Sequence, residues 1–344
     1  MSRKIKLVSL LLPVIALSFP ASGAMKKRLE AKVETTGSEP AVLWRDPTDI
    51  KTRDLFYGPG GKEHQPHGTF RFLKEDLDGT NPKFIVRDDA GVKWKAKLGS
   101  EARPETVATR LVWAVGYFTN EDYFLPNFQV ENMPARLHRG QKLIAPGNSM
   151  HNVRLKRYME GEQKIGNWEW RHSPFTGTRE LNGLRVLMAL LNNWDLTDEN
   201  NAVYAEEYDR KKNPAERIYM VSDLGSTFGT GRLTWPLRNA RGNLRAYCHS
   251  RFISKVGTDY VDFRVPTRPA LFFLATPREY FSKLKLRWIG RHVPRDDVKW
   301  LGQLLAQLSP DQIRDAFRAA GYSPQEVEGF ADVLQNRIAT LEDL

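Results

Sequence analysis

The stretch LMALLNNWDLTDENNAVY, residues 187–204, ends an apolar run in a cluster of acidic and amide side chains and then returns to strand-like residues. Apolar side chains recur over residues 184–191 across a face wide enough to predict a buried helix. Downstream, NAVYAEEY and RIYMVSD flank the turn-prone RKKNP, so these two segments predict a β-hairpin. The polar cluster would then lie at the mouth of that hairpin.

The hairpin is expected to bring two oxygen-bearing side chains together. Asn200 leads into its first strand, and Asp223 follows its second strand in the sequence SDLGSTFG. Because hairpin strands are antiparallel, the start of one lies beside the end of the other, so Asn200 and Asp223 should converge. An amide oxygen and a carboxylate suit a hard cation such as Mg²⁺, which completes its shell with phosphate oxygens and water. The pattern therefore predicts a site for a metal–nucleotide complex.

The interval from Asp195 to Asn200 matches the one between the catalytic Asp and the metal-binding Asn of the protein-kinase loop. Asp-Leu-Gly at residues 223–225 stands where a kinase has Asp-Phe-Gly. A lone Asp-x-Gly is usually a turn, so the prediction rests on the joint pattern. A calcium loop of the EF-hand type is the weaker interpretation, because DLTDENN lacks the central Gly and the closing Glu.

The sequence from residue 69 predicts a small N-terminal lobe. TFRFLKED reads as a strand, and FIVRDDAGVKWKAKLG reads as an antiparallel hairpin whose second strand alternates apolar residues with three lysines. EARPETVATRLVWAVGY predicts a helix with Pro104 at its first position and Gly116 at its end. After an irregular stretch to residue 148, NVRLKRYMEG predicts one more strand. The expected fold is α+β and bilobal, with an antiparallel sheet and one helix before a larger, mainly helical C-lobe.

Lys97, on the second hairpin strand, is the candidate to bind nucleotide phosphates. A helix acid often holds such a lysine in place, and either Glu105 or Glu101 could do so here. Lys93 and Lys95 on the same strand are interpreted as a solvated basic face.

The turn GTNPK, residues 79–83, is a candidate phosphate loop. From Gly79 onward it offers backbone N–H groups, and Lys83 could contact the β and γ phosphates. An ordinary turn is the alternative interpretation.

Residues 79–117 resemble the N-lobe of the HipA-like kinases. The resemblance lies in a Gly-x-x-Pro-Lys loop, a hairpin ending in Lys-x-Gly and a Glu-led helix ending in Ala-Val-Gly. The C-lobe resembles that family and the phosphoinositide-kinase-like fold more broadly, so the resemblance covers about residues 69 to 310. It differs where relatives follow the catalytic Asp with a basic pair, because Leu196 and Thr197 stand there. The resemblance implies ATP and Mg²⁺ as cofactors, with Asp195 as catalytic base, Asn200 and Asp223 as magnesium ligands, Lys97 as nucleotide lysine and Lys83 in the phosphate loop.

The first 24 residues, MSRKIKLVSLLLPVIALSFPASGA, have the layout of a secretory signal peptide. Basic residues come first, an apolar run too short for a stable membrane span follows, and small residues precede a cleavage site expected after Ala24. The expected location is therefore the periplasm or the extracellular space, without a stable span after cleavage. An uncleaved N-terminal anchor is the alternative.

Composition limits the remaining classes of function. The net charge of +11 favours anionic partners, but no nucleic-acid recognition motif is present, so a nucleic-acid partner is not expected. A single cysteine, Cys248, excludes an internal disulfide framework and a cysteine-cluster metal site. Residues 25–68 are polar and are interpreted as an extended lead-in, followed by an N-lobe over 69–160 and a C-lobe over 161–344. Within the C-lobe, two segments that begin with Ser-Pro, at residues 309 and 323, predict capped amphipathic helices.

The favoured function is an exported kinase-like enzyme that transfers the γ-phosphoryl group of ATP to a hydroxyl of a protein or a small molecule. A catalytically inactive pseudokinase serving as an envelope interaction module is the main alternative. A basic scaffold for an anionic cell-surface polymer is a third. Residues 232–247 follow Asp-Leu-Gly where a substrate loop would lie, and an acidic substrate could bind its arginines, unless they form a solvated basic loop: Arg232, Arg238, Arg241 and Arg245.

Overall fold

The computed structural model describes residues 39–344, except 80, 160, 207–215, 235–237, 266–276, 278–280 and 282–283. The predicted signal peptide and the first part of the lead-in lie outside the described residues. Among the residues that are described, no helix is both long and apolar enough to cross a membrane.

The N-terminal strands form a closed five-stranded barrel in the order β2-β3-β4-β6-β5. The sequence predicted an antiparallel sheet, and most neighbours are indeed antiparallel, but β2 and β5 pair in parallel and close the barrel. Aromatic and aliphatic side chains, including Phe84 and Trp94, fill its interior. The bounds are β2 (Phe70–Asp76), β3 (Lys83–Arg87), β4 (Lys93–Leu98), β5 (Asp122–Glu131) and β6 (Ser149–Arg157).

Strand β5 lies in the segment expected to be irregular. It runs for ten residues in spite of Pro126. Strand β5 keeps its pairing with β6 on both sides of that proline, with Leu125 opposite Val153 and Asn127 opposite His151. A proline within a sheet signals an edge or a bulge, so it concealed this strand from sequence analysis.

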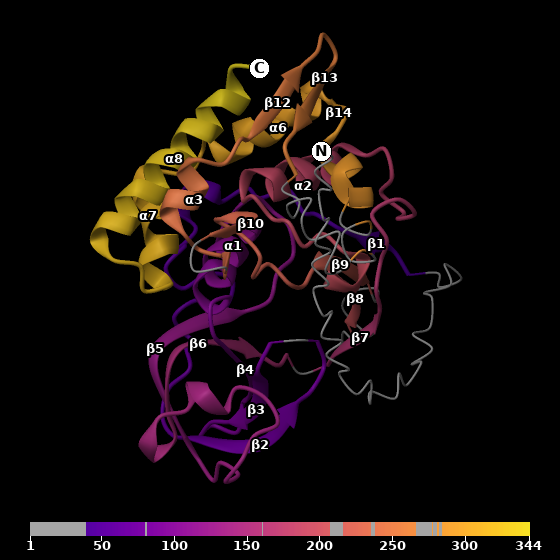
Figure 1. Cartoon of the computed structure of the whole chain (residues 1–344). Coiled ribbons are helices and arrows are strands. Elements are labelled where there is room, and N and C mark those ends of the chain that lie inside the picture. The colour runs from indigo at the N-terminus through magenta and orange to yellow at the C-terminus, as the bar shows by residue number, and fades with distance from the viewer. Residues whose placement is uncertain are drawn as a thin grey trace, which may run out of the picture. The chain divides into compact units, whose positions relative to one another are not determined.

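Helix α1 (Ala102–Ala114) contacts β5 and β6 of the barrel and also helix α7. It begins two residues before Pro104, so that proline occupies the third helical position instead of the predicted first one. The helix ends where expected, because Gly116 has a φ of 93° and a Cβ there would lie 2.2 Å from the carbonyl oxygen of Arg45. Figure 1 shows α1 between the barrel strands and the C-terminal helices.

The predicted β-hairpin is present as β8 (Asn201–Glu206) and β9 (Arg217–Val221). It belongs to a four-stranded sheet of order β1-β9-β8-β7, with β7 (Glu162–Gly166) on one edge. On the other edge, β1 (Ala41–Val42) from the lead-in pairs in parallel with β9. The buried helix predicted before the hairpin is α2 (Arg179–Leu190).

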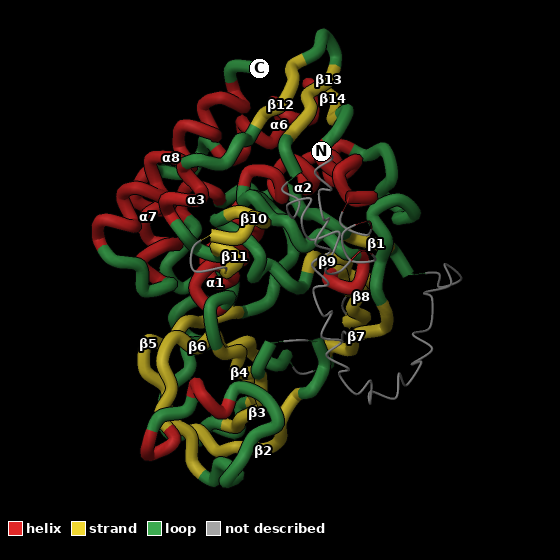
Figure 2. Tube along the Cα trace, viewed as in Figure 1, coloured by secondary structure: helices red, strands yellow, loops and turns green. Residues whose placement is uncertain are grey.

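The C-terminal part contains the predicted helices and several strands that were not predicted (Figure 2). Both Ser-Pro segments start helices with complete capping boxes, Ser309 with Gln312 and Ser323 with Glu326. Apolar side chains of α2, α6, α7 and α8 share one large core. The bounds are β10 (Thr230–Thr234), β11 (Arg238–Ala240), α3 (Leu244–Cys248), β12 (Ile253–Val256), β13 (Tyr260–Phe263), β14 (Val293–Pro294), α6 (Arg295–Leu305), α7 (Pro310–Ala319) and α8 (Pro324–Glu342).

Candidate functional site

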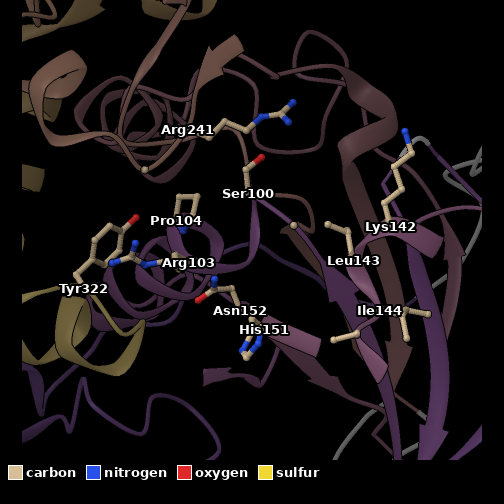
Figure 3. A pocket seen from close by; sticks show the side chains of 13 residues that line it. Ser100, Arg103, Pro104, Lys142, Leu143, Ile144, His151, Asn152, Arg241 and Tyr322 are labelled. Atoms are coloured by element: carbon tan, nitrogen blue, oxygen red, sulfur yellow. The ribbon is translucent and has the colours of Figure 1, made fainter. Parts of the chain in front are cut away.

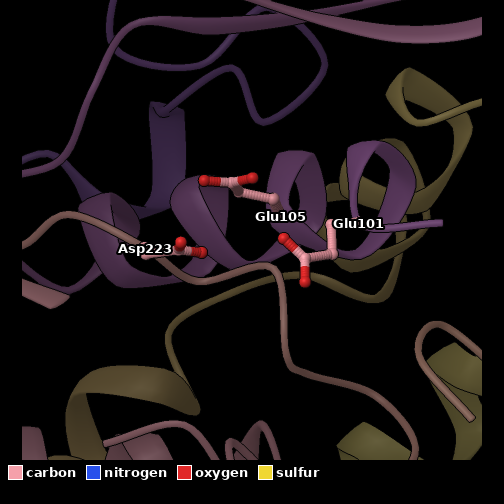
Figure 4. A group of neighbouring side chains, drawn as sticks. All are labelled: Glu101, Glu105 and Asp223. Carbon is pink, nitrogen blue, oxygen red and sulfur yellow. The ribbon is translucent and has the colours of Figure 1, made fainter. Parts of the chain in front are cut away.

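Lys97 lies at the centre of a buried ionic cluster between β4 and α1. Its side chain is 5% exposed, and its Nζ lies 2.7 Å from Glu101 Oε2 and 2.9 Å from Glu105 Oε2. The Oδ1 of Asp223 lies 3.2 Å from the same nitrogen, although 126 residues separate the two in sequence. Sequence analysis left open whether Glu101 or Glu105 pairs with Lys97, and in the structure both do. Figure 4 shows the three carboxylates converging from α1 and from the segment after β9.

The charges in this cluster stabilise one another. Burial alone would lower the pKa of Lys97, but Glu105, Asp223 and Glu101 together raise it above its usual value. Burial would likewise raise the pKa of Asp223, but the ammonium of Lys97 and the N–H of Gly225 lower it to about 2. Lys97 is therefore a fixed positive charge at neutral pH, and Asp223 is a fixed negative one.

The three carboxylates could also be taken for a metal site, because one oxygen from each lies within 4.8 Å of the others. The ammonium of Lys97 makes an ion pair with every one of them. The Lys97 ammonium already neutralises the negative charge of these carboxylates, so we interpret the three carboxylates as the groups that hold Lys97 in place. A divalent cation would instead need the oxygens that face away from Lys97.

Arg154 holds Glu105 from the side opposite Lys97. Its guanidinium lies 2.9 Å from Glu105 Oε1 and 2.9 Å from Asp122 Oδ1, and all three side chains are buried. Arg154 stands directly opposite Lys97 in the β4–β6 register. The two cations therefore lie side by side and share the carboxylate of Glu105. Sequence analysis missed Arg154 and Asp122. The alternating pattern of NVRLKR offered a weak signal, since it puts Arg154 between two buried positions.

The hairpin mouth brings Asp195, Asn200 and Asp223 together. The backbone N–H groups of Ser222 and Asp223 donate to the carbonyl of Asn200 at 2.8 and 3.3 Å. The Nδ2 of Asn200 donates to the carbonyl of Asp195 at 2.7 Å. Asn193 in turn accepts from the N–H of Asp195 through Oδ1 at 2.9 Å, which fixes the turn after α2.

Two oxygens at this mouth have the chemistry that a magnesium ion requires. Asp223 uses Oδ1 to accept from Lys97 and from the N–H of Gly225, and Asn200 uses its amide nitrogen as a donor. The second carboxylate oxygen of Asp223 and the amide oxygen of Asn200 are therefore available as hard ligands. The side chain of Asp223 is 40% exposed, so an ion can reach it from solvent. These residues fit a hard divalent cation.

The turn from Gly79 to Lys83 lies beside this cluster, because Lys83 stands opposite Lys97 in the β3–β4 register. Gly79 has a φ of 63°, and a Cβ there would lie 3.6 Å from the Nζ of Lys83. The guanidinium of Arg139 donates to the carbonyl oxygens of Gly79 and Asp76 and thereby supports the turn.

Lys83 is a half-buried cation that makes no ion pair with any residue that the structure describes. Burial lowers its pKa; the charge of Asp76 opposes this, while the neighbouring ammonium groups of Lys95 and Lys97 add to it. Such a position favours a bound anion.

The predicted basic loop contributes one arginine to the cluster. Arg241 lies 3.0 Å from Glu101 Oε1 through Nη1, on the side of that carboxylate away from Lys97. Arg245 is exposed on α3, and the side chains of Arg232 and Arg238 fall outside the described ones. Arg241 is therefore part of the structure that fixes Lys97.

The Asp223 carboxylate is expected to stabilise the fold in a pH-dependent manner. Its pKa of about 2 lies below the usual 3.8, so its contribution is complete above about pH 4 and is lost as the pH falls toward 2. The difference in melting temperature between the wild type and Asp223→Asn should be constant near neutral pH and should shrink on acidification. Calorimetry at matched pH measures it, and a difference that grows in acid would contradict the assignment.

Comparison with known proteins gives a distant likeness to kinases. No family model and no curated protein sequence matches the chain. Among solved structures, the proinflammatory kinase CtkA of Helicobacter pylori is similar at 10% identity and a TM-score of 0.44, over 79% of this chain and 96% of that one. The Golgi casein kinase is similar at 11% identity and a TM-score of 0.28, over 80% of this chain and 74% of that one. The HipA-like resemblance stays a prediction.

Proposed function

We propose that the chain is a kinase-like phosphotransferase that uses ATP and Mg²⁺ to phosphorylate a hydroxyl group. The observation that carries the proposal is the contact of Lys97 with both Glu105 and Asp223, next to the Asn200 carbonyl that anchors Asp223. A lysine paired with a helix glutamate, beside an Asp-x-Gly aspartate, is the arrangement that positions nucleotide phosphates in kinases.

In this proposal, the two lysines bind the phosphates. Glu101 and Glu105 hold the Lys97 ammonium in place, and its third donor, which Asp223 accepts at 3.2 Å, would turn to a phosphate oxygen when nucleotide binds. Lys83 and the backbone of the Gly79 turn would contact the terminal phosphates. Asn200 and Asp223 would hold the magnesium ion, which neutralises charge on the phosphate oxygens when it is bound.

Asp195 would act on the acceptor. Its carboxylate takes the proton from the acceptor hydroxyl as the hydroxyl oxygen forms a bond to the γ-phosphorus. The bond between that phosphorus and the bridging oxygen to the β-phosphate breaks, and ADP leaves with the bond's electrons. The hydrogen bond from Asn200 to the Asp195 carbonyl links this base to the metal ligands.

The acceptor is proposed to be a hydroxyl of a protein or small molecule outside the cytoplasm, in line with the signal-like first 24 residues. A pseudokinase is the second candidate. It is favoured by Leu196 and Thr197, which replace the basic pair that follows the catalytic Asp in the resembling family.

Asp195→Asn separates the two candidates. For an active enzyme, we expect phosphoryl transfer from γ-labelled ATP to fall by about 10²–10⁴-fold, because the general base is lost. The Mg²⁺-dependent rise in melting temperature caused by ATP should remain, since Asp195 is not expected to hold the nucleotide.

Glu199→Gln is the matched control, because it removes an exposed carboxylate from the same turn. A wild-type chain that shows the ATP-dependent shift and transfers no phosphate to itself or to an envelope extract is a pseudokinase. A chain without any shift under any divalent metal would overturn the active enzyme and would favour the pseudokinase as an interaction module.

A further inference from the structure

A cavity of about 590 Å³ shares no lining residue with those assigned to nucleotide and metal, although its Arg241 also contacts Glu101 of the Lys97 cluster. The start of α1, the loop before β6, the turn after β11 and the segment after α7 surround it (Figure 3). Its volume falls within the range of small-molecule sites. Its lining includes Arg103, Pro104, Lys142, Ile144, Arg241 and Tyr322.

The lining of this cavity is positively charged. It contains Arg103, Lys142 and Arg241 and no acidic residue, although Arg103 pairs with Glu326 and Arg241 pairs with Glu101 from outside the lining. Lys142 is exposed and makes no ion pair with the part of the chain that the structure describes. Helix α1 begins here without a side-chain cap, so the positive end of its dipole lies at the cavity, beside the carboxylates of Glu101 and Glu105. These charges favour an anion.

An unpaired hydroxyl provides an independent indication of a ligand. The hydroxyl of Tyr322 has no hydrogen-bond partner, although the residue is only 6% exposed. Figure 3 shows it directed toward Pro104 at the start of α1. It fits there because Gly242 lacks a side chain, since a Cβ on that glycine would lie 2.2 Å from the hydroxyl oxygen. A buried hydroxyl without a partner is unfavourable, so an acceptor from a ligand would complete it.

The donors in the cavity match a phosphate group better than a carboxylate. Arg241 has an Nε that is also buried without a partner, while its Nη1 is engaged by Glu101. Together with the Tyr322 hydroxyl and the Lys142 ammonium, this gives donors from three segments of the chain. Three donors that line one cavity suit the terminal oxygens of a phosphate monoester. Leu143 and Ile144 form an apolar wall that suits an organic substituent.

We propose that this cavity binds an organic phosphate monoester, with the phosphate at the start of α1 between Arg241 and Tyr322 and the apolar part against Ile144. Binding here does not require that the chain be a kinase. Phenyl phosphate is a suitable probe, because it combines a phosphate with an apolar ring.

Calorimetric titration of the purified chain with phenyl phosphate tests the proposal. We expect binding that weakens as salt is added, because charge attracts the ligand. Tyr322→Phe removes only the unpaired hydroxyl, so it should weaken binding by about tenfold while leaving the ligand-free melting temperature unchanged or raised. Lys142→Ala should weaken binding by roughly threefold. Benzyl alcohol, which lacks the phosphate, should not bind.

Lys93→Ala is the matched control, since Lys93 is an exposed lysine outside the cavity and its loss should leave binding unchanged. Asp223→Ala distinguishes this cavity from the nucleotide site. Phenyl phosphate binding that persists in Asp223→Ala supports a separate site. Absence of binding at millimolar concentration, equal affinity in Tyr322→Phe, or loss of binding in Asp223→Ala would each overturn the proposal.

Discussion

Replacing Asp223 by Ala is expected to abolish Mg²⁺-dependent nucleotide binding while leaving the fold intact. The substitution removes a carboxylate at the hairpin mouth that both faces solvent and contacts Lys97. Loss of a metal ligand removes several kcal/mol of charge stabilisation, which corresponds to a decrease in affinity of roughly a hundredfold or more. Lys97 keeps its contacts with Glu101 and Glu105, so the fold should tolerate the change. Thermal shift with ATP, with and without Mg²⁺, measures the effect.

Glu199→Ala is the control for this experiment, because it removes an exposed acid one residue before Asn200. It should bind Mg²⁺ and ATP like the wild type. If Asp223→Ala keeps the wild-type nucleotide affinity, Asp223 is not a metal ligand and the proposed function is wrong.

The largest loss of stability is expected from Arg154→Met. Arg154 is the buried partner of two carboxylates, Glu105 and Asp122, and neither can reach water when it is removed. Removing one partner from a buried ion network leaves an uncompensated charge, which typically destabilises a protein by about 3–5 kcal/mol. Urea denaturation of the wild type and of Arg154→Met measures the difference in the free energy of unfolding.

Arg157→Met is the matched control on the same strand. Its guanidinium contacts Glu121 at 3.4 Å but is 22% exposed, so its loss should change stability by about 1 kcal/mol or less. Adding Asp122→Asn to Arg154→Met should recover part of the loss, because it neutralises one of the stranded carboxylates. If Arg154→Met and Arg157→Met lower the free energy of unfolding equally, the buried ion pairs of Arg154 do not stabilise the fold more than an exposed ion pair does.

The elements with strong local signals were predictable from sequence. The capped helices α7 and α8, the helix α2 and the hairpin of β8 and β9 follow from capping residues and apolar spacing, which act over a few residues. Strand β5 was missed because Pro126 weakens the local strand pattern. Closure of the barrel was missed as well, since the parallel pairing of β2 with β5 joins segments about 60 residues apart.

The contacts of the candidate site also differ in whether the local sequence predicts them. The sequence predicts that Asn200 and Asp223 lie close together because a hairpin links them, and hairpin geometry is local. The contact between Lys97 and Asp223 joins residues 126 positions apart, and no local pattern encodes such a distance. Arg154 went unnoticed because its partners, Glu105 and Asp122, come from a helix and from the concealed strand.

The sequence by itself determined the helices α2, α7 and α8 and the hairpin of β8 and β9, and it placed Asp195, Asn200 and Asp223 around one turn. Only the tertiary structure decided that both Glu101 and Glu105 hold Lys97, that Arg154 shares Glu105, and that a basic cavity opens at the start of α1. The physical reason is range. Capping, spacing and turn chemistry act within a few residues, whereas a buried charge takes whichever partners the packed chain brings within about 3 Å of it.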